Sequence, residues 1–243
     1  YFEYHPAPGR LSQDEVELVV YDFGAVSVVY RTPLSETTPD LVLLSESLYE
    51  NEKLYTDSRK RVEEFLKIIA RAVSEPDISS FVEDYLIFHV EAFSEAISVE
   101  DLVTRHAREV AQILRAEVRE LSADEVTDAL SQRISYGGDD LAVVDWNAAL
   151  VVDKEPEDVL AVLEFANVEL LEMRFLDRRL DDALGLAYER QLKRSRKWFP
   201  FRSDPSDLRD ISRWQVDSAM LFEGVNNVLK LLGDQYLARL YRL

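Results

Sequence analysis

Residues 141–152 read Leu-Ala-Val-Val-Asp-Trp-Asn-Ala-Ala-Leu-Val-Val, which is two apolar runs separated by a short polar turn. Valine-rich runs of this length favour β-strands. Asp145 and Asn147 in the turn are residue types that tolerate the backbone dihedral angles of tight turns. The stretch therefore predicts a β-hairpin.

Two further segments have strand character. Residues 16–31 contain two β-rich runs broken at Asp22-Phe23-Gly24, which predicts another hairpin. Residues 84–93 are rich in aromatic and β-branched side chains and are short, which predicts a buried strand. The strands are thus expected to pair as hairpins rather than as β-α-β units.

Helical patterns occupy most of the remaining chain. Apolar residues at helical spacing predict two helices within 40–73 and one that begins at Ser98, and Ser122 with Glu125 forms a capping box before another. Between Pro156 and about Lys197 there is no further proline and one glycine. A near-heptad apolar stripe in this region predicts one unusually long helix. The stripe consists of Leu163, Ala166, Leu170, Met173, Leu180, Leu184 and Ala187.

A matching stripe runs from Leu208 to Leu243, after a break at Pro200–Pro205. Two matching stripes predict an antiparallel helical hairpin. The expected fold class is α+β, in which a small hairpin-built β-sheet with helices occupies 1–153. A long antiparallel helical hairpin would occupy 154–243, packed on that domain or projecting from it as one unit.

Composition restricts the partners and the compartment. The net charge of −19 over 243 residues disfavours nucleic acid, so no nucleic-acid partner is expected. The chain has no cysteine, which excludes disulfides and thiolate metal sites and fits the cytoplasm.

The sequence contains no run of about 18–20 apolar residues, which is the length needed to span a bilayer. The chain lacks an initiator methionine and stops inside a periodic segment, so we expect a longer protein, with association through a C-terminal membrane anchor absent from this chain as one possibility.

The sequence contains none of the motifs with well-understood catalytic mechanics, such as a glycine-rich phosphate loop or a His-Glu-x-x-His pair. We therefore assign no catalytic residue, no metal ligand and no cofactor, and a non-enzymatic role is favoured. The three histidines His5, His89 and His106 are scattered, and each is expected to be structural.

One acidic group supports an alternative interpretation. Asp139, Asp140 and Asp145 could hold Mg²⁺ in a hydrolase- or nuclease-like enzyme, or they could be turn residues. The acidic residues between Glu169 and Asp181 are expected to form a solvated or salt-bridged helix face. Trp146 is expected to anchor the core, although it could instead mark a binding site.

The segment 190–202 combines six cations and three aromatic residues with no acidic residue. Such a composition favours docking to an anionic membrane surface or to an acidic protein partner. Alternatively, the cations meet the dipole at a helix end and the aromatic residues cap the core. The candidate binding residues are Arg190, Lys193, Arg194, Arg196, Lys197, Trp198, Phe199, Phe201 and Arg202.

Several phrases of the sequence are similar to those of a known family. They are Tyr21-Asp22-Phe23-Gly24-Ala25-Val26, Asp139-Asp140-Leu141, Asp145-Trp146-Asn147-Ala148-Ala149, Leu163-Glu164-Phe165-Ala166-Asn167, Leu170-Leu171-Glu172-Met173-Arg174-Phe175 and Val228-Leu229-Lys230-Leu231-Leu232-Gly233-Asp234-Gln235-Tyr236. With them the chain resembles bacterial members of the "required for meiotic nuclear division" (Sad1-interacting factor) family. The resemblance implies an α+β domain, long helices and often a C-terminal membrane anchor, with a scaffold role near membranes and no catalytic residues.

Together, these features predict a non-enzymatic scaffold or tether. It would be a homo-oligomer that self-associates through its long helices, in the manner of a coiled coil, and that acts near a membrane.

Overall fold

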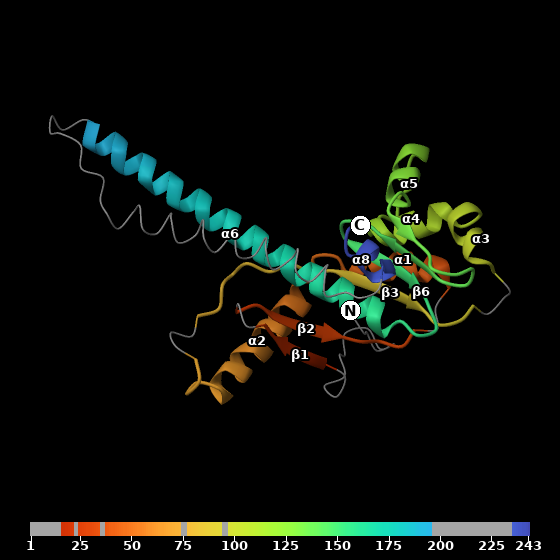
Figure 1. The fold of residues 1–243 in the computed structure, drawn as a ribbon, viewed down its shortest axis with the longest axis horizontal. Coiled ribbons are helices and arrows are strands. Elements are labelled where there is room, and N and C mark those ends of the chain that lie inside the picture. Colours follow the sequence, from red (N-terminus) through yellow and green to blue (C-terminus); the bar gives the residue numbers. More distant parts are fainter. Residues whose placement is uncertain (1–15, 22–23, 35–36, 74–76, 94–96, 196–234) are drawn as a thin grey trace.

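The computed structural model describes residues 16–21, 24–34, 37–73, 77–93, 97–195 and 235–243. Its centre is a four-stranded sheet in the order β3-β6-β5-β4 (Figure 1). The strands are β3 (Leu86–Val90), β4 (Arg133–Ile134), β5 (Leu141–Val144) and β6 (Ala148–Val152). The predicted hairpin is confirmed, because β5 and β6 are antiparallel and Val144 pairs with Ala149. The predicted strand within 84–93 is confirmed as β3.

The expectation that strands pair only as hairpins is wrong for β3. This strand runs parallel to β6, with Leu86 opposite Ala148. A parallel pair needs a long crossover connection, and here the crossover carries three helices and two strands. Because β3 has no neighbouring strand in the sequence, its partner could not be read from a local turn signal.

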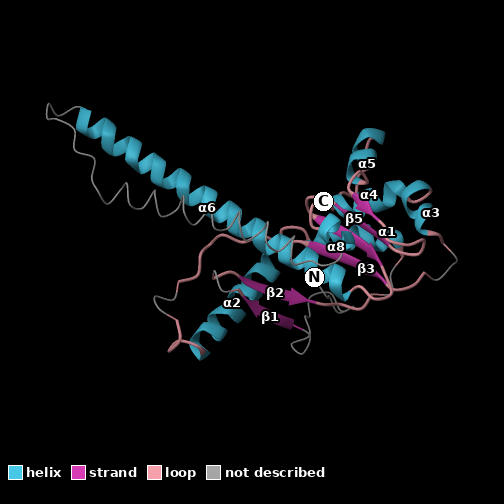
Figure 2. Ribbon diagram, viewed as in Figure 1, coloured by secondary structure: helices cyan, strands magenta, loops and turns pink. Residues whose placement is uncertain are grey.

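Helices cover both faces of the central sheet (Figure 2). On one face, Leu141, Val143 and Leu150 form a core with α1 (Thr38–Leu48), α3 (Val99–Thr104) and α4 (Ala107–Arg115). On the other, Ala142, Ala149 and Val151 pack against α6 (Glu157–Ser195) and α8 (Gln235–Leu240). Because helices cover both sides of β6, all five of its residues are buried. A strand in such a position needs an apolar residue at every site, as the sequence of β6 has.

The other helices begin at the expected signals. The helices α1 and α2 (Glu52–Ile68) fill the region predicted for two helices, and Asn51 caps α2 by accepting from the backbone of Lys53 and Leu54. Ser98 forms a capping box with Asp101 at the start of α3. The side chain of Ser122 accepts from the Glu125 backbone at the start of α5 (Ala123–Ala129).

The strands β1 (Val16–Val20) and β2 (Val26–Tyr30) form a separate two-stranded antiparallel sheet, which confirms the second predicted hairpin. Gly24 lies in its turn with φ +99°, a conformation that suits glycine. Side-chain hydrogen bonds attach this sheet to its surroundings. The Tyr30 hydroxyl donates to Asp57 of α2 (2.8 Å), and the Ser27 hydroxyl donates to Glu164 of α6 (2.6 Å).

The helix α6 is a single helix of 39 residues, as predicted, and it extends well beyond the body (Figure 1). At about 1.5 Å per residue it is about 58 Å long. Its first turns lie in the core through Val159, Val162 and Leu163, whereas Met173 and Leu184 are 39% and 46% exposed. The fold class is therefore α+β. The second arm of the predicted helical hairpin falls largely on 196–234, outside the described residues.

The short helix α8 lies against the beginning of α6, where Leu240 is 2% exposed and packs with Val159 and Leu163. None of the helices in the described ranges is both long enough and apolar enough to cross a membrane.

Candidate functional site

The turn between β5 and β6 is held by an unusual number of polar contacts for three residues. The Asp145 N–H donates to the Ala148 carbonyl (2.9 Å), and the Asp145 carboxylate accepts from the Trp146 N–H (2.8 Å). The Tyr85 hydroxyl, just before β3, donates to the Asp145 carbonyl (2.9 Å). These contacts fix the turn relative to the parallel strand.

Arg115, the last residue of α4, holds the same turn from the other side. Its Nε donates to Asp145 (2.9 Å) and its Nη2 to Asp128 (2.6 Å), while its Nη1 contacts Glu125. The side chains of Arg115 and Asp145 are only 15% and 12% exposed. The guanidinium thus joins α4, α5 and the β5–β6 turn, and Asp145 is engaged in an internal ion pair.

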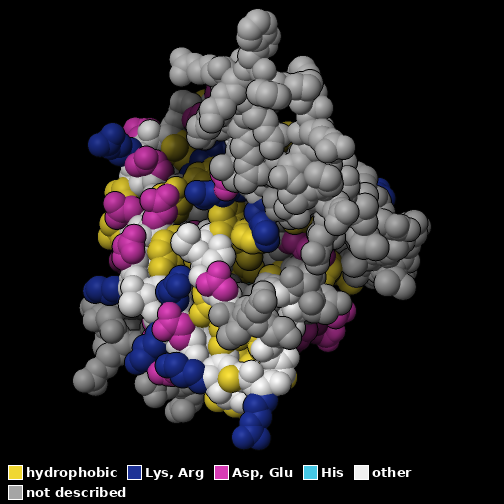
Figure 3. Space-filling model, turned by 90° about the vertical axis from the view of Figure 1, so that its left-hand side faces the viewer, with side chains coloured by type: hydrophobic (Ala, Val, Ile, Leu, Met, Phe, Trp, Pro, Cys, Tyr) yellow, Lys and Arg dark blue, Asp and Glu magenta, His cyan; other side chains and the backbone are white. Residues whose placement is uncertain are grey.

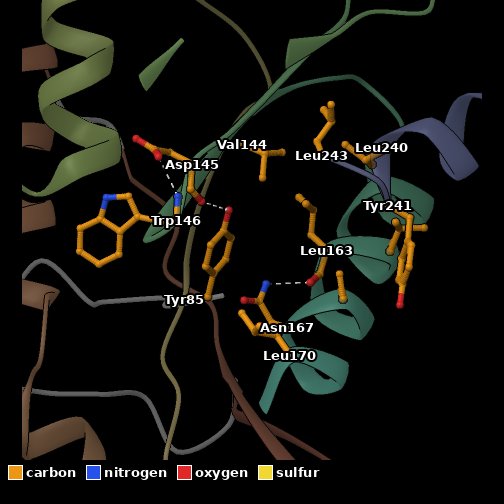
Figure 4. A pocket seen from close by; sticks show the side chains of 12 residues that line it. Tyr85, Val144, Asp145, Trp146, Leu163, Asn167, Leu170, Leu240, Tyr241 and Leu243 are labelled. Carbon is orange, nitrogen blue, oxygen red and sulfur yellow. Dashed lines mark hydrogen bonds between the residues drawn. The ribbon is translucent and has the colours of Figure 1, made fainter. Parts of the chain in front are cut away.

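A small cavity lies beneath this turn, against α6 and the C-terminal residues (Figure 4). Its volume is about 150 Å³, well below the roughly 300–1,000 Å³ of typical small-molecule pockets. It has room for one inserted side chain. Its lining residues are Tyr85, Val144, Asp145, Trp146, Val162, Leu163, Ala166, Asn167, Leu170, Leu240, Tyr241 and Leu243.

Two polar side chains of the cavity, Tyr85 and Asn167, are engaged in hydrogen bonds. The Asn167 amide donates to the Leu163 carbonyl (2.8 Å), one turn earlier in α6. Burial, and then the charge of Asp145, raises the pKa of the Tyr85 phenol. A phenol with a raised pKa stays neutral near pH 7 and donates rather than acting as a base. The cavity is therefore suited to holding an apolar group, not to acid–base chemistry.

The structure does not bring the three candidate aspartates together. Asp140 lies before β5, where its carboxylate accepts from the Tyr136 N–H (2.7 Å) and shapes the turn after β4, and Asp139 is exposed beside it. Asp145 lies beyond the other end of β5, about 16 Å away along an extended strand. Within the described ranges, no group of three or more His, Asp or Glu side chains could hold a metal ion.

Two other candidates are placed as follows. The His89 ring donates from Nε2 to the Asp153 carbonyl (2.8 Å), as expected for a structural histidine. Glu169 was expected on a solvated or salt-bridged face, and its exposure of only 6% excludes the solvated alternative. The helix face that carries it turns toward the C-terminal residues, where its charge, together with burial, raises the pKa of Tyr241 to about 12. Asp177 and Asp181, further along α6, are exposed as expected.

Trp146 does not anchor the core. The expectation of a packed indole is wrong, because the side chain is 62% exposed. The inward positions of the hairpin are filled by the alternating residues of β5 and β6, and a turn residue lies outside this ladder. In Figure 4 the indole lies on the opposite side of Tyr85 from Leu163. Its neighbour is Tyr49, whose ring meets it edge-on at 6.0 Å between centroids.

The basic segment is described only in part. Residues 190–195 lie in the last turns of α6, where the structure describes the backbone, and 196–202 lie outside the described residues. Figure 3 shows the molecule from the side toward which α6 projects, and charged side chains of both signs are interspersed there with apolar ones. The described part of this face therefore offers mixed charge rather than a continuous basic surface.

Sequence reasoning missed Arg115, Tyr85 and Tyr49. Arg115 and Tyr85 contact Asp145, and Tyr49 contacts Trp146. In each case the partner is distant in the sequence. The signal that could have pointed to them is the turn itself, since a polar turn between fully apolar strands needs partners from other elements.

Comparison with known proteins identifies the family. A model of the family described as "Uncharacterized protein MJ0711, N-terminal domain" matches residues 7–158, which is more than half of the chain. The chain belongs to this family. The MJ0711 protein of Methanocaldococcus jannaschii, itself described as uncharacterized, is 21% identical over 229 residues. The match covers 93% of this chain and 64% of that protein, so the chain spans less than two thirds of the relative's length.

Membership of the MJ0711 family corrects the resemblance drawn from short phrases of the sequence. No match to the "required for meiotic nuclear division" family accompanies it, and that assignment is wrong. The quoted phrases that fall within the described residues lie in strands, turns and helices, and unrelated α+β proteins share such patterns for physical reasons. No solved structure matches the chain.

Proposed function

We propose that this protein is a non-enzymatic scaffold or tether, in which an α+β body anchors the base of a long helical arm. The observation that carries the proposal is the continuity of α6. Its first turns are buried through Val159, Val162 and Leu163, and the same helix continues beyond the body. An element built into the core at one end and projecting at the other is suited to connecting two partners.

The arm is proposed to be an antiparallel helical hairpin. The far end of α6 at Ser195 lies about 58 Å from its start, whereas α8 packs beside that start through Leu240. A second arm between Ser195 and Gln235 is proposed to connect these two points. The apolar stripe at 208–243 supports a helical return, since a helix of similar length covers the same distance.

The division into a part at 1–153 and a part at 154–243 is proposed on two grounds. The family match ends at residue 158, next to the start of α6 at Glu157. The side chains that α6 contributes to the core lie in its first turns. The two parts are proposed to form one unit, because those turns complete the second face of the sheet.

Self-association is proposed to occur through the arm, as in a coiled coil. Self-association requires more apolar surface on the arm than one helical hairpin covers, and Met173 and Leu184 keep 39% and 46% of their surface exposed, with Leu180 between them partly exposed. Apolar residues at heptad spacing on a long helix are the residues that a second copy would bury.

Small-angle scattering with light scattering tests the proposal. A compact chain of this length has a radius of gyration of about 18 Å, and the arm should raise the protomer well above that value. We expect the parent to exceed the mass of one chain and Leu184→Glu to reduce its association. Val20→Glu is the matched control, because Val20 is 49% exposed on β1. A compact monomer at all concentrations would refute the proposal.

A further inference from the structure

An aromatic pair lies at the edge of the candidate site, formed by the exposed indole of Trp146 and the partly buried ring of Tyr49. Trp146 is 62% exposed and meets Tyr49 edge-on, with an angle of 88° between the rings. Tyr49 ends α1, and the next residue, Glu50, adopts φ +48°. A left-handed conformation is unfavourable for a residue other than glycine, so this turn is held in place by its surroundings. The pair is therefore a fixed surface feature rather than a loose loop.

The surroundings of the pair are acidic. Burial and the carboxylates of Glu50 and Asp84 raise the pKa of Tyr49. Burial, a hydrogen bond to Asp84 (2.8 Å), and the charges of Glu50 and Glu52 likewise raise the pKa of Tyr55. Three carboxylates thus lie close to these two phenols, and Lys53 on α2 is the cation within the same stretch 49–55. Together Glu50, Glu52, Asp84 and Lys53 carry a net charge of −2.

Aromatic rings beside carboxylates attract a specific kind of ligand. The face of an indole or phenol attracts a guanidinium or ammonium group, with Trp the strongest of the aromatic residues. Carboxylates beside the rings add charge-assisted hydrogen bonds, for which the planar arginine fork is well suited. The ligand that fits is a peptide segment rich in arginine and lysine.

We propose that this surface, formed by Tyr49, Trp146, Glu50, Glu52 and Asp84, binds the basic segment 190–202 of a second copy of the chain. The proposal rests on the scaffold function above and names one of its contacts. The segment carries +6 while the remainder of the chain carries −25, given a net charge of −19. Charge complementarity within one sequence is thus greatest between this segment and an acidic surface of the body.

The contact is made between copies, not within one. Trp146 lies across Tyr85 from Leu163 of α6, and Arg190 follows Leu163 by 27 residues in the same continuous helix. At about 1.5 Å per residue Arg190 lies about 40 Å from Leu163, which lines the same cavity as Trp146, and no side chain spans such a distance. A tip that docks on the body of the next copy is a head-to-tail contact, and such contacts generate open chains or rings.

Mixing two variants tests this geometry. The surface variant carries Trp146→Ala and Glu50→Gln, and the tip variant carries Lys193, Arg194, Arg196 and Lys197 changed to Gln. Each should associate at least about tenfold more weakly than the parent. A 1:1 mixture should form a larger assembly than either variant alone, because one variant keeps the tip and the other keeps the surface. Trp146→Ala alone should weaken the contact about two- to fivefold without changing the net charge.

The controls use matched residues. Tyr136 is 82% exposed and meets Tyr236 edge-on at 5.8 Å, so Tyr136→Ala removes an exposed aromatic pair elsewhere and should leave association unchanged. Circular dichroism confirms that each variant is folded. The masses are measured by sedimentation equilibrium at low salt, and the parent, the surface variant and the tip variant are each also sedimented with anionic vesicles.

The outcomes separate the two proposals. If the parent is oligomeric but the surface variant associates equally well, or if the mixture forms no larger assembly than either variant alone, the head-to-tail contact is wrong and the scaffold proposal stands. If the parent is monomeric, both fail. If vesicles bind the parent and the surface variant alike but not the tip variant, the basic segment recognises a membrane and the contact proposed here is wrong.

Discussion

The two hairpins of this protein look alike in sequence and differ in their surroundings. All five residues of β6 are buried, and so are the first three of the four in β5. In β1 no residue is fully buried, and Glu17 and Val20 are exposed. The local sequence determines that a hairpin forms, whereas its burial depends on the layers that other elements supply. The hairpin at 141–152 has helices on both faces, while the hairpin at 16–30 is buried mainly at Val29 and Tyr30 of β2 and is also held by side-chain hydrogen bonds.

The largest difference in stability between the two hairpins is expected when one apolar side chain of each is truncated to alanine. Leu150→Ala in β6, at a site 4% exposed, should lower the free energy of unfolding by about 2–5 kcal/mol. Leu18→Ala in β1, at a partly exposed site, should lower it by about 1 kcal/mol or less. Urea unfolding followed by circular dichroism measures both. Equal losses would show that the two sheets are equally integrated and would remove the contrast.

An intermediate effect is expected from the ion pairs of the two hairpins. Arg115→Met leaves Asp145 nearly buried without its partner and should cost about 2 kcal/mol of stability. Arg31→Met removes the pair with Glu17, in which both side chains are about half exposed, and should cost about 0–0.5 kcal/mol. A cost for Arg31→Met as large as that for Arg115→Met, in the same unfolding experiment, would contradict this difference.

The smallest effect concerns tyrosine titration. Burial and Glu164 raise the pKa of Tyr21 to about 12, and burial and Asp145 raise that of Tyr85. A pKa raised in the folded state favours the neutral phenol. Its contribution is complete below the ordinary pKa of about 10 and is lost as the pH rises through the folded-state value. At pH 7, Tyr85→Phe should cost about 1 kcal/mol and Tyr21→Phe about 0.5 kcal/mol.

Stability measured from pH 8 to pH 12 checks the titration. The parent should lose stability above about pH 10, and Tyr85→Phe should reduce this loss more than Tyr21→Phe. If the two variants follow the parent's curve unchanged, these phenols are not the groups that titrate.

Much of the local structure could be predicted because its causes are local. Gly24 and the Asp145 turn end strands, Ser98 and Ser122 begin helices, and the region after Pro156 lacks helix breakers. These signals depend on hydrogen bonds and dihedral angles within a few residues.

The site could not be predicted to the same degree, because its causes lie far apart in the sequence. The parallel pairing of β3 with β6, the burial of Glu169 and the exposure of Trp146 depend on which faces other elements cover. The ion pair of Arg115 with Asp145 spans 30 residues and follows no periodic pattern. The short phrases that suggested another family failed for a related reason, since they encode local structure rather than ancestry.

The length of α6 gives the molecule a mechanical property. The cavity of about 150 Å³ lies at the base of this helix, between its first turns and the β5–β6 turn, whereas Ser195 lies about 58 Å from its start. The helix is anchored beside the cavity, so a change in its tilt there moves its far end over a larger distance. Leu163 beside the cavity lies about 48 Å from Ser195, so a tilt of about 5° there would displace Ser195 by about 4 Å, and a small adjustment among Leu163, Asn167 and Tyr241 would be magnified several-fold at the far end.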